Sequence, residues 1–111
     1  MEQEFRVEFS EACELDVDAI YLYFQRRSIR SATRWYKGFL NECESLTTLP
    51  ERCPELPHIP GVRRHLYGRY IVLFRIMMPS GGVSSPATVR ILHVYHGSRS
   101  LSYRSVSDVD I

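Results

Sequence analysis

Two neighbouring stretches decide how this chain folds: Tyr70-Ile71-Val72-Leu73-Phe74-Arg75-Ile76-Met77-Met78 and Thr88-Val89-Arg90-Ile91-Leu92-His93-Val94-Tyr95-His96. Both are rich in β-branched and aromatic residues, and turn-forming residues bound each of them. Residues 71–74 and 91–94 are apolar, or nearly so, at odd and even positions alike. Because such strands have both faces covered, we expect these two at the centre of a sheet.

Two further strands are expected around them. Residues 62–67 form a third strand of this half, which Gly68 separates from the next. Near the start of the chain, Phe5, Val7 and Phe9 alternate with charged residues, the period-two pattern of a strand with one wet face. This segment is short and charged, which favours a position at the edge of the sheet.

Between the first strand and the others the periodicity is helical. A helix is expected over residues 11–27, capped by Ser10, with an apolar stripe of Leu15, Ala19, Leu22 and Tyr23. Ser31 is the expected cap of a second helix that Pro50 ends. Its stripe places Trp35 and Tyr36 in the core, together with Ala32, Phe39, Cys43, Leu46 and Leu49.

These elements predict an α+β fold of βααβββ order: an N-terminal strand, an antiparallel two-helix hairpin and a three-stranded antiparallel sheet. Residues 50–61 hold four of the six prolines and are expected to be an extended, non-helical connector. The Pro-, Gly- and Ser-rich residues 79–86 form the last loop. We expect one domain over residues 1–100 and a C-terminal tail over residues 101–111.

The bulk composition narrows the classes of protein. The 111 residues are 44% apolar, enough for one core, and no apolar run reaches the roughly 18 residues of a membrane span. The first residues lack the pattern of a signal peptide, so a cytoplasmic protein is expected. The odd number of cysteines favours reduced, buried thiols. His93 and His96 point to opposite faces of a strand, and we expect no metal or cofactor.

Charge divides the chain into two unlike halves. Between Leu56 and Ser107 there are seven arginines and all four histidines but no Asp or Glu, a formal charge of +7 against −4 for residues 1–55. An uncompensated cluster of arginine attracts phosphate or carboxylate. We therefore expect the functional surface in the second half, facing an acidic partner.

The order of elements and several local signatures resemble the RelE/ParE toxins of bacterial type II toxin–antitoxin systems. The resemblance covers about residues 5–100, and its most specific part is His96-Gly97-Ser98-Arg99 after an apolar strand. The other matching positions are Phe9-Ser10-Glu11-Ala12, Asp16, Ile20, Tyr23, Ala32, Tyr36, Leu49-Pro50, Gly61-Val62-Arg63-Arg64, residues 70–76 and residues 89–95.

The resemblance implies a small toxin that causes growth arrest, serves plasmid stabilisation and is held inactive by a co-expressed antitoxin. The acidic or amphipathic C-terminal segment of that antitoxin wraps the helical hairpin and the sheet. By this resemblance the residues expected to contact it are Leu15, Ala19, Leu22 and Arg75.

Two activities divide the family: RelE-like members cut mRNA in the ribosome, whereas ParE-like members inhibit DNA gyrase. RelE-like toxins use lysines and arginines on the sheet, but the single lysine here, Lys37, lies on the second expected helix. Where they have Gly-Tyr-Arg, this chain has Gly68-Arg69-Tyr70, with a tyrosine in the arginine position as in many ParE-like members. A pI of about 7.8 is also low for a protein that docks on the ribosome.

We therefore expect a ParE-like, non-enzymatic inhibitor of DNA gyrase. Its expected target-binding residues are Arg63, Arg64, Arg69, Arg90, His96 and Arg99. The alternative is a RelE-like, ribosome-dependent mRNA endoribonuclease, in which catalysis falls to Arg99, His96, Arg69 and Tyr103.

Overall fold

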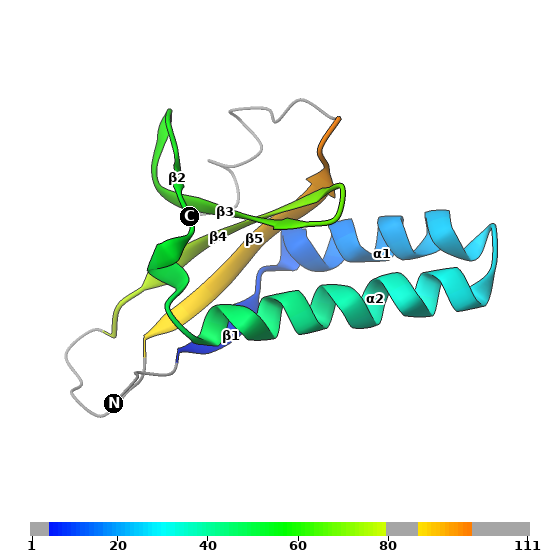
Figure 1. The fold of residues 1–111 in the computed structure, drawn as a ribbon, viewed down its shortest axis with the longest axis horizontal. Helices are drawn as coiled ribbons and strands as arrows, with labels where there is room; N and C mark the ends of the chain where they lie inside the picture. Colours follow the sequence, from blue (N-terminus) through cyan, green and yellow to red (C-terminus); the bar gives the residue numbers. More distant parts are fainter. Residues whose placement is uncertain (1–4, 80–86, 99–111) are drawn as a thin grey trace.

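A twisted five-stranded sheet carries a long helical hairpin on one face, and the hairpin projects past the end of the sheet (Figure 1). The computed structural model describes residues 5–79 and 87–98. Its elements are β1 (Arg6–Phe9), α1 (Glu11–Gln25), α2 (Ile29–Glu44), η1 (Ser45–Thr47), η2 (Pro50–Arg52), β2 (Glu55–Leu56), β3 (Ile59–Tyr67), β4 (Tyr70–Met77) and β5 (Thr88–His96). The α+β fold and its βααβββ order are confirmed.

The strand order is β1-β5-β4-β3-β2, so the two apolar strands do lie inside the sheet. The antiparallel pairs β3–β4 and β4–β5 form its middle, and β1 lies parallel to β5 at one edge. Phe74 is paired with Ile91 and Leu73 with His93, which leaves Leu92 as an extra residue in β5. This bulge bends β5 and changes the phase of the side chains that follow it.

The predicted N-cap of α1 is confirmed, and the predicted N-cap of α2 is wrong. Ser10 caps α1, because its hydroxyl accepts a hydrogen bond from the backbone N–H of Cys13. The expected Ser31 cap is wrong: Ser28 is the N-cap of α2 and accepts from the N–H of Ser31. Helix α2 therefore begins at Ile29, and only a short turn joins it to α1.

The connector after α2 contains a short 3-10 helix, although its prolines were expected to exclude helical structure. Pro50 opens a 3-10 turn, where its missing N–H has no helical partner to lose. Leu49, just before it, has a positive φ of 49° and is 57% exposed, so it does not join the core as expected. The strand after the connector begins at Ile59 rather than at residue 62, and the short β2 pairs with it.

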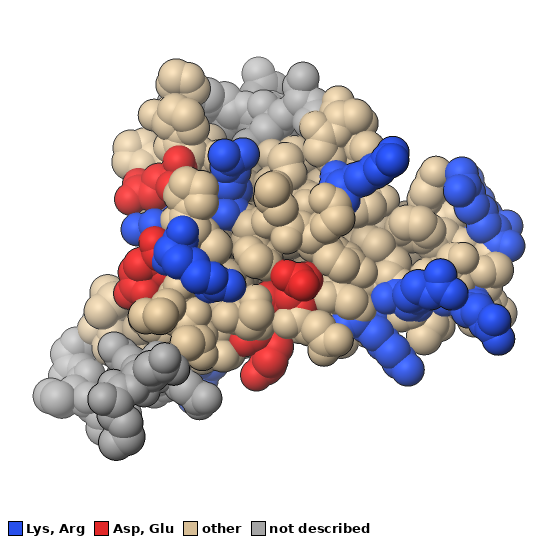
Figure 2. Space-filling model, in the orientation of Figure 1, with Lys and Arg blue, Asp and Glu red and all other residues tan. Residues whose placement is uncertain are grey.

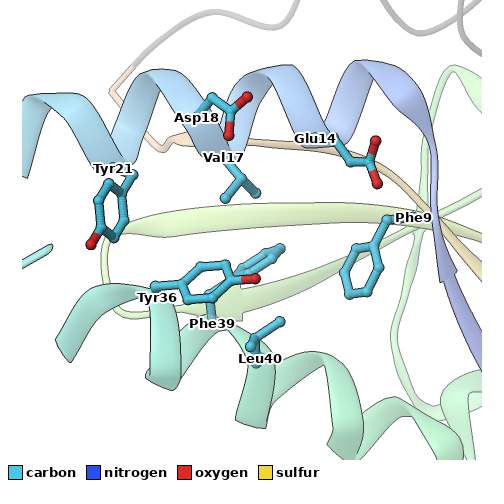
Figure 3. Close-up of a pocket in the computed structure, with 8 residues that line it drawn as sticks. All are labelled: Phe9, Glu14, Val17, Asp18, Tyr21, Tyr36, Phe39 and Leu40. Carbon is cyan, nitrogen blue, oxygen red and sulfur yellow. The ribbon is translucent and has the colours of Figure 1, made fainter. Parts of the chain in front are cut away.

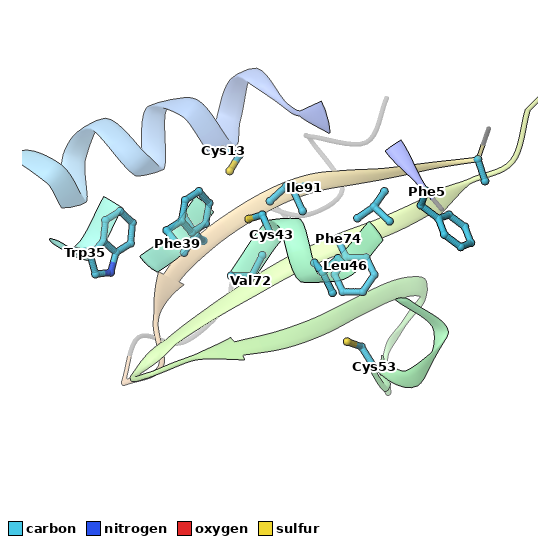
Figure 4. Packing of buried hydrophobic residues seen from close by; sticks show 13 residues of the cluster. Phe5, Cys13, Trp35, Phe39, Cys43, Leu46, Cys53, Val72, Phe74 and Ile91 are labelled. Carbon is cyan, nitrogen blue, oxygen red and sulfur yellow. The ribbon is translucent and has the colours of Figure 1, made fainter. Parts of the chain in front are cut away.

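The main core lies between the helices and the sheet (Figure 4). Trp35 stacks on Phe39 with ring centroids 5.3 Å apart, and both rings are buried against Val72, Phe74 and Ile91 of the central strands, with Cys13, Cys43 and Leu46 beside them. Tyr36 is 39% exposed, so its expected place in the core is wrong. The three cysteines are free and buried, as expected. A smaller cluster of Val62, Leu73 and Leu92 covers the opposite face of the sheet.

Gly38 allows α2 and β3 to approach closely. The Tyr67 hydroxyl donates a hydrogen bond of 2.9 Å to the Trp35 carbonyl, one turn before Gly38 on α2. A Cβ atom at position 38 would lie 2.1 Å from that hydroxyl oxygen, well inside van der Waals contact. A side chain here would therefore push the sheet and the hairpin apart.

Among the described residues, no helix is long and apolar enough to cross a membrane. Residues 80–86 of the loop expected over residues 79–86, and the tail over residues 101–111, lie outside the described residues.

Candidate functional site

Acidic residues of the first half pair with some of the basic side chains of the acid-free second half. Arg90 pairs with Glu8, Arg63 with Glu55, and two histidines, His65 and His93, bond Glu42 and Asp16 at 2.7 Å each. Each ion pair joins residues that are far apart in the sequence or lie on different elements. The expectation of an uncompensated cationic half is therefore wrong for these side chains, because folding supplies the missing acids.

The expected target-binding residues do not form one surface. Arg63 donates hydrogen bonds to the carbonyls of Glu51 and Cys53, so it holds the connector against β3. Arg64, next to it, points to the opposite face of the sheet, where its charge counters the pKa increase that burial causes at Tyr95. Arg69 is exposed in the β3–β4 turn. Arg99 and Tyr103 lie outside the described residues.

Two of the expected residues, Arg69 and His96, do meet at one end of the sheet. The N–H of Gly97 donates a 2.7 Å hydrogen bond to the Arg69 carbonyl, which ties the end of β5 to the β3–β4 turn. The His96 ring packs edge-on against Tyr70, with centroids 5.3 Å apart. Burial raises the pKa of Tyr70, so its hydroxyl stays protonated at neutral pH.

A groove of about 720 Å³ opens between this end of the sheet and α1. Its floor is aromatic, with Phe24 and Trp35 packed around Tyr70. Its rim carries two cations, Arg27 and Arg69, and its other lining residues include Asp16, Ala19, Ile20, Tyr23, Tyr67, Val94, Tyr95 and His96. The groove is therefore apolar inside and basic at its rim.

The outer face of α1 adds an exposed apolar surface beside the groove. Leu15 is 65% exposed, Leu22 is 56% exposed and Tyr23 is 50% exposed, and Ala19 between them is exposed as well. The stripe that packs on the core is a different one and consists of Cys13, Val17, Ile20 and Phe24. Leu15, Ala19 and Leu22 are thus together and accessible. Arg75 is half-buried in the sheet and lies apart from them.

Comparison with known families identifies the chain. The family model of the ParE toxin of the type II toxin–antitoxin system, parDE, matches residues 7–101. The chain belongs to the ParE toxin family. A chain from the structure of the chromosomal ParDE TA system from P. aeruginosa has a similar fold, with a TM-score of 0.65 and 18% identity over 84% of this chain and 96% of that one. No curated protein matches the sequence significantly.

This ParE-family toxin has a second groove, which the sequence did not predict, between α1 and α2 (Figure 3). It measures about 560 Å³, and its walls are Phe9, Val17, Tyr21, Tyr36, Phe39 and Leu40. Glu14 and Asp18 of α1 stand at its rim, so its charge is opposite to that of the first groove. Tyr21 and Tyr36 meet edge to face with centroids 6.2 Å apart. Sequence periodicity placed Tyr36 in the core, and this groove is why it is accessible.

The toxin also has a basic surface at the tip of its helical hairpin that the sequence analysis missed. Figure 2 shows Lys and Arg side chains gathered there without an Asp or Glu beside them. The sequence carries a signal for it, since residues 19–41 contain five cations and no acid, but this stretch is shorter than the acid-free stretch over residues 56–107.

Proposed function

We propose that this ParE-family toxin inhibits DNA gyrase by direct protein contact and that a cognate antitoxin neutralises it. The observation that carries the antitoxin part is the exposed apolar face of α1, beside a groove with an aromatic floor. Leucines more than half exposed on one helix face gain hydrophobic free energy when a partner covers them.

The charge of the groove rim indicates the chemistry of the antitoxin segment. Arg27 and Arg69 stand on either side of the opening, and neither forms an ion pair within the residues that the structure describes. An amphipathic segment with acidic residues would place its apolar side chains on α1 and its carboxylates near these guanidinium groups. Binding should then weaken with salt, because the rim charges are exposed to solvent.

The geometry around His96 favours inhibition over RNA cleavage. A nuclease of this fold needs a group that accepts the proton of the RNA 2′-hydroxyl. Nδ1 of His96 accepts a hydrogen bond from the N–H of Ser98 and lies 2.8 Å from the Ser98 hydroxyl oxygen, so this nitrogen is engaged within its own turn. The sheet also lacks lysine, since Lys37 lies on α2.

A DNA supercoiling assay tests the proposal. The purified toxin should stop gyrase from supercoiling relaxed plasmid, and the co-expressed antitoxin should restore supercoiling. A matched translation reaction measures mRNA cleavage at the same toxin concentrations. Unhindered supercoiling together with cleavage of translated mRNA would reject the proposal and favour the RelE-like activity.

A further inference from the structure

We propose that the tip of the helical hairpin is a binding surface for the phosphate backbone of duplex DNA. The surface, here called the basic tip, consists of Arg26, Arg27, Arg30, Arg34 and Lys37. All five residues are exposed: Arg26 and Arg27 lie in the turn after α1, and Arg30, Arg34 and Lys37 lie on α2. Figure 2 shows Lys and Arg side chains gathered at the end of the molecule where the helical hairpin projects beyond the sheet.

The basic tip has no acidic counterpart. Residues 19–41 contain no Asp or Glu, and no ion pair of the described part of the chain involves any of the five cations. Arg63 and Arg90 of the sheet differ in this respect, because each has an acidic partner. Surfaces without a specific partner usually carry interspersed charges of both signs. The basic tip is therefore a cluster of positive charges that no ion pair neutralises in the described part of the chain.

The arrangement of the three cations on α2, Arg30, Arg34 and Lys37, opposes local stability. Arg30 lies in the first turn of α2, where the helix dipole disfavours a positive charge. Arg34 follows Arg30 by four residues and Lys37 follows Arg34 by three, so each is the neighbour of a like charge on one helix face. An acidic residue at any of these positions would stabilise the hairpin. A bound polyanion relieves both the dipole and the like-charge repulsion.

The shape and composition of the tip favour nucleic acid over an acidic protein segment. Of the five, Arg27 lines one of the two grooves described above and the other four line neither of them. Protein interfaces need a buried core, whereas contacts to phosphate need only positioned cations. Four of the five residues are arginines, whose planar guanidinium groups bind phosphate oxygens in pairs.

The spacing of the cations suits a nucleic acid backbone. Arg30, Arg34 and Lys37 form a stripe of roughly 10 Å along α2, on the face opposite the buried Trp35 and Phe39. Arg27, in the turn before α2, donates a hydrogen bond of 3.2 Å to the Tyr23 hydroxyl and lies over its ring. The choice of duplex DNA among polyanions rests on the proposed function, because gyrase holds duplex DNA while it acts.

The test measures binding of the purified toxin alone to a 30-base-pair duplex of arbitrary sequence by fluorescence anisotropy. Three to five phosphate contacts predict that raising the salt from 50 to 200 mM weakens binding by about 40-fold to 500-fold. The double variant R30Q/R34Q should lose about 1.8 from the slope of log K against log salt. Arg6→Gln, which removes an exposed arginine on β1, should leave the slope unchanged.

Failure of the variants to fold does not confuse the result, because removing like charges from the hairpin should preserve or raise its melting temperature. The proposal is overturned if the toxin does not bind the duplex at 50 mM salt, or if R30Q/R34Q binds as the wild type does. It is also overturned if poly-glutamate of equal charge displaces the duplex, or if single-stranded RNA of equal length binds more than tenfold tighter. The binding assay contains no gyrase, so its result is independent of the supercoiling assay. A toxin that fails to inhibit supercoiling can still bind the duplex, and a toxin that does not bind the duplex can still inhibit supercoiling.

Discussion

Replacing the two exposed leucines of α1 with alanine should weaken antitoxin binding strongly while leaving the toxin folded. Full burial of a leucine side chain is worth about 1.5–3 kcal/mol. Leu15 keeps 65% and Leu22 keeps 56% of its surface exposed, so an antitoxin that covers both gains about 2–3.5 kcal/mol from them. The variant L15A/L22A should therefore bind about 20-fold to 400-fold more weakly.

The same exposure predicts a small effect on folding. Only about a third to a half of each side chain is buried in the toxin, so each substitution should cost about 1 kcal/mol or less in the free energy of unfolding. Alanine also keeps a high helix propensity. Isothermal titration calorimetry with the co-expressed antitoxin gives the affinity, and urea unfolding followed by circular dichroism gives the stability.

Leu66→Ala is the matched control, since Leu66 is 59% exposed but lies on the sheet face that carries no helix. Its affinity for the antitoxin should equal that of the wild type. If L15A/L22A binds within threefold of the wild type, the antitoxin does not cover this face of α1 and the reasoning fails.

Three further predictions concern the packing that supports these surfaces. Burial raises the pKa of Cys43 to about 12, so the folded toxin keeps the thiol proton at pH values where the unfolded chain has lost it. The free energy of unfolding should therefore be unaffected by this thiol below about pH 9 and should fall as the pH rises toward 12. Cys43→Ala should reduce this fall by about 1.4 kcal/mol per pH unit, measured by urea unfolding at two pH values. Gly38→Ala should cost about 1–3 kcal/mol in thermal or urea unfolding, because its Cβ collides with the Tyr67 hydroxyl, and adding Tyr67→Phe should recover part of that loss; an unchanged single variant contradicts the contact. Asp16→Ala should cost about 1–3 kcal/mol in the same assay, because the buried N–H of Val94 loses its acceptor, whereas Asp18→Ala on the exposed side should have little effect.

Strand and helix order could be read from the sequence because these patterns are local. The apolar runs in β4 and β5 have no polar face, so they had to lie inside a sheet, and the alternation in β1 suited only an edge. Helix ends were less accurate. Ser28 and Ser31 are both good caps, and the choice between them depends on where the turn after α1 ends.

The faces of the helices depended on packing. Leu15, Ala19 and Leu22 make a regular stripe, but so do Val17, Ile20 and Phe24, and only the position of α2 and the sheet decides which stripe is buried. Tyr36 was assigned to the core for the same reason, although the groove between the helices exposes it.

The pairing of the charged side chains is the feature that the sequence could least predict. The sequence by itself determined that residues 56–107 carry no acid, that Lys37 is the single lysine and that the order of elements is that of a RelE/ParE toxin. Only the tertiary structure decided which cations are neutralised, because Coulomb interactions depend on distance in space and not along the chain. Folding brings Glu8 to Arg90 and Glu55 to Arg63, and within the described residues it leaves the five cations of the basic tip without an ion pair.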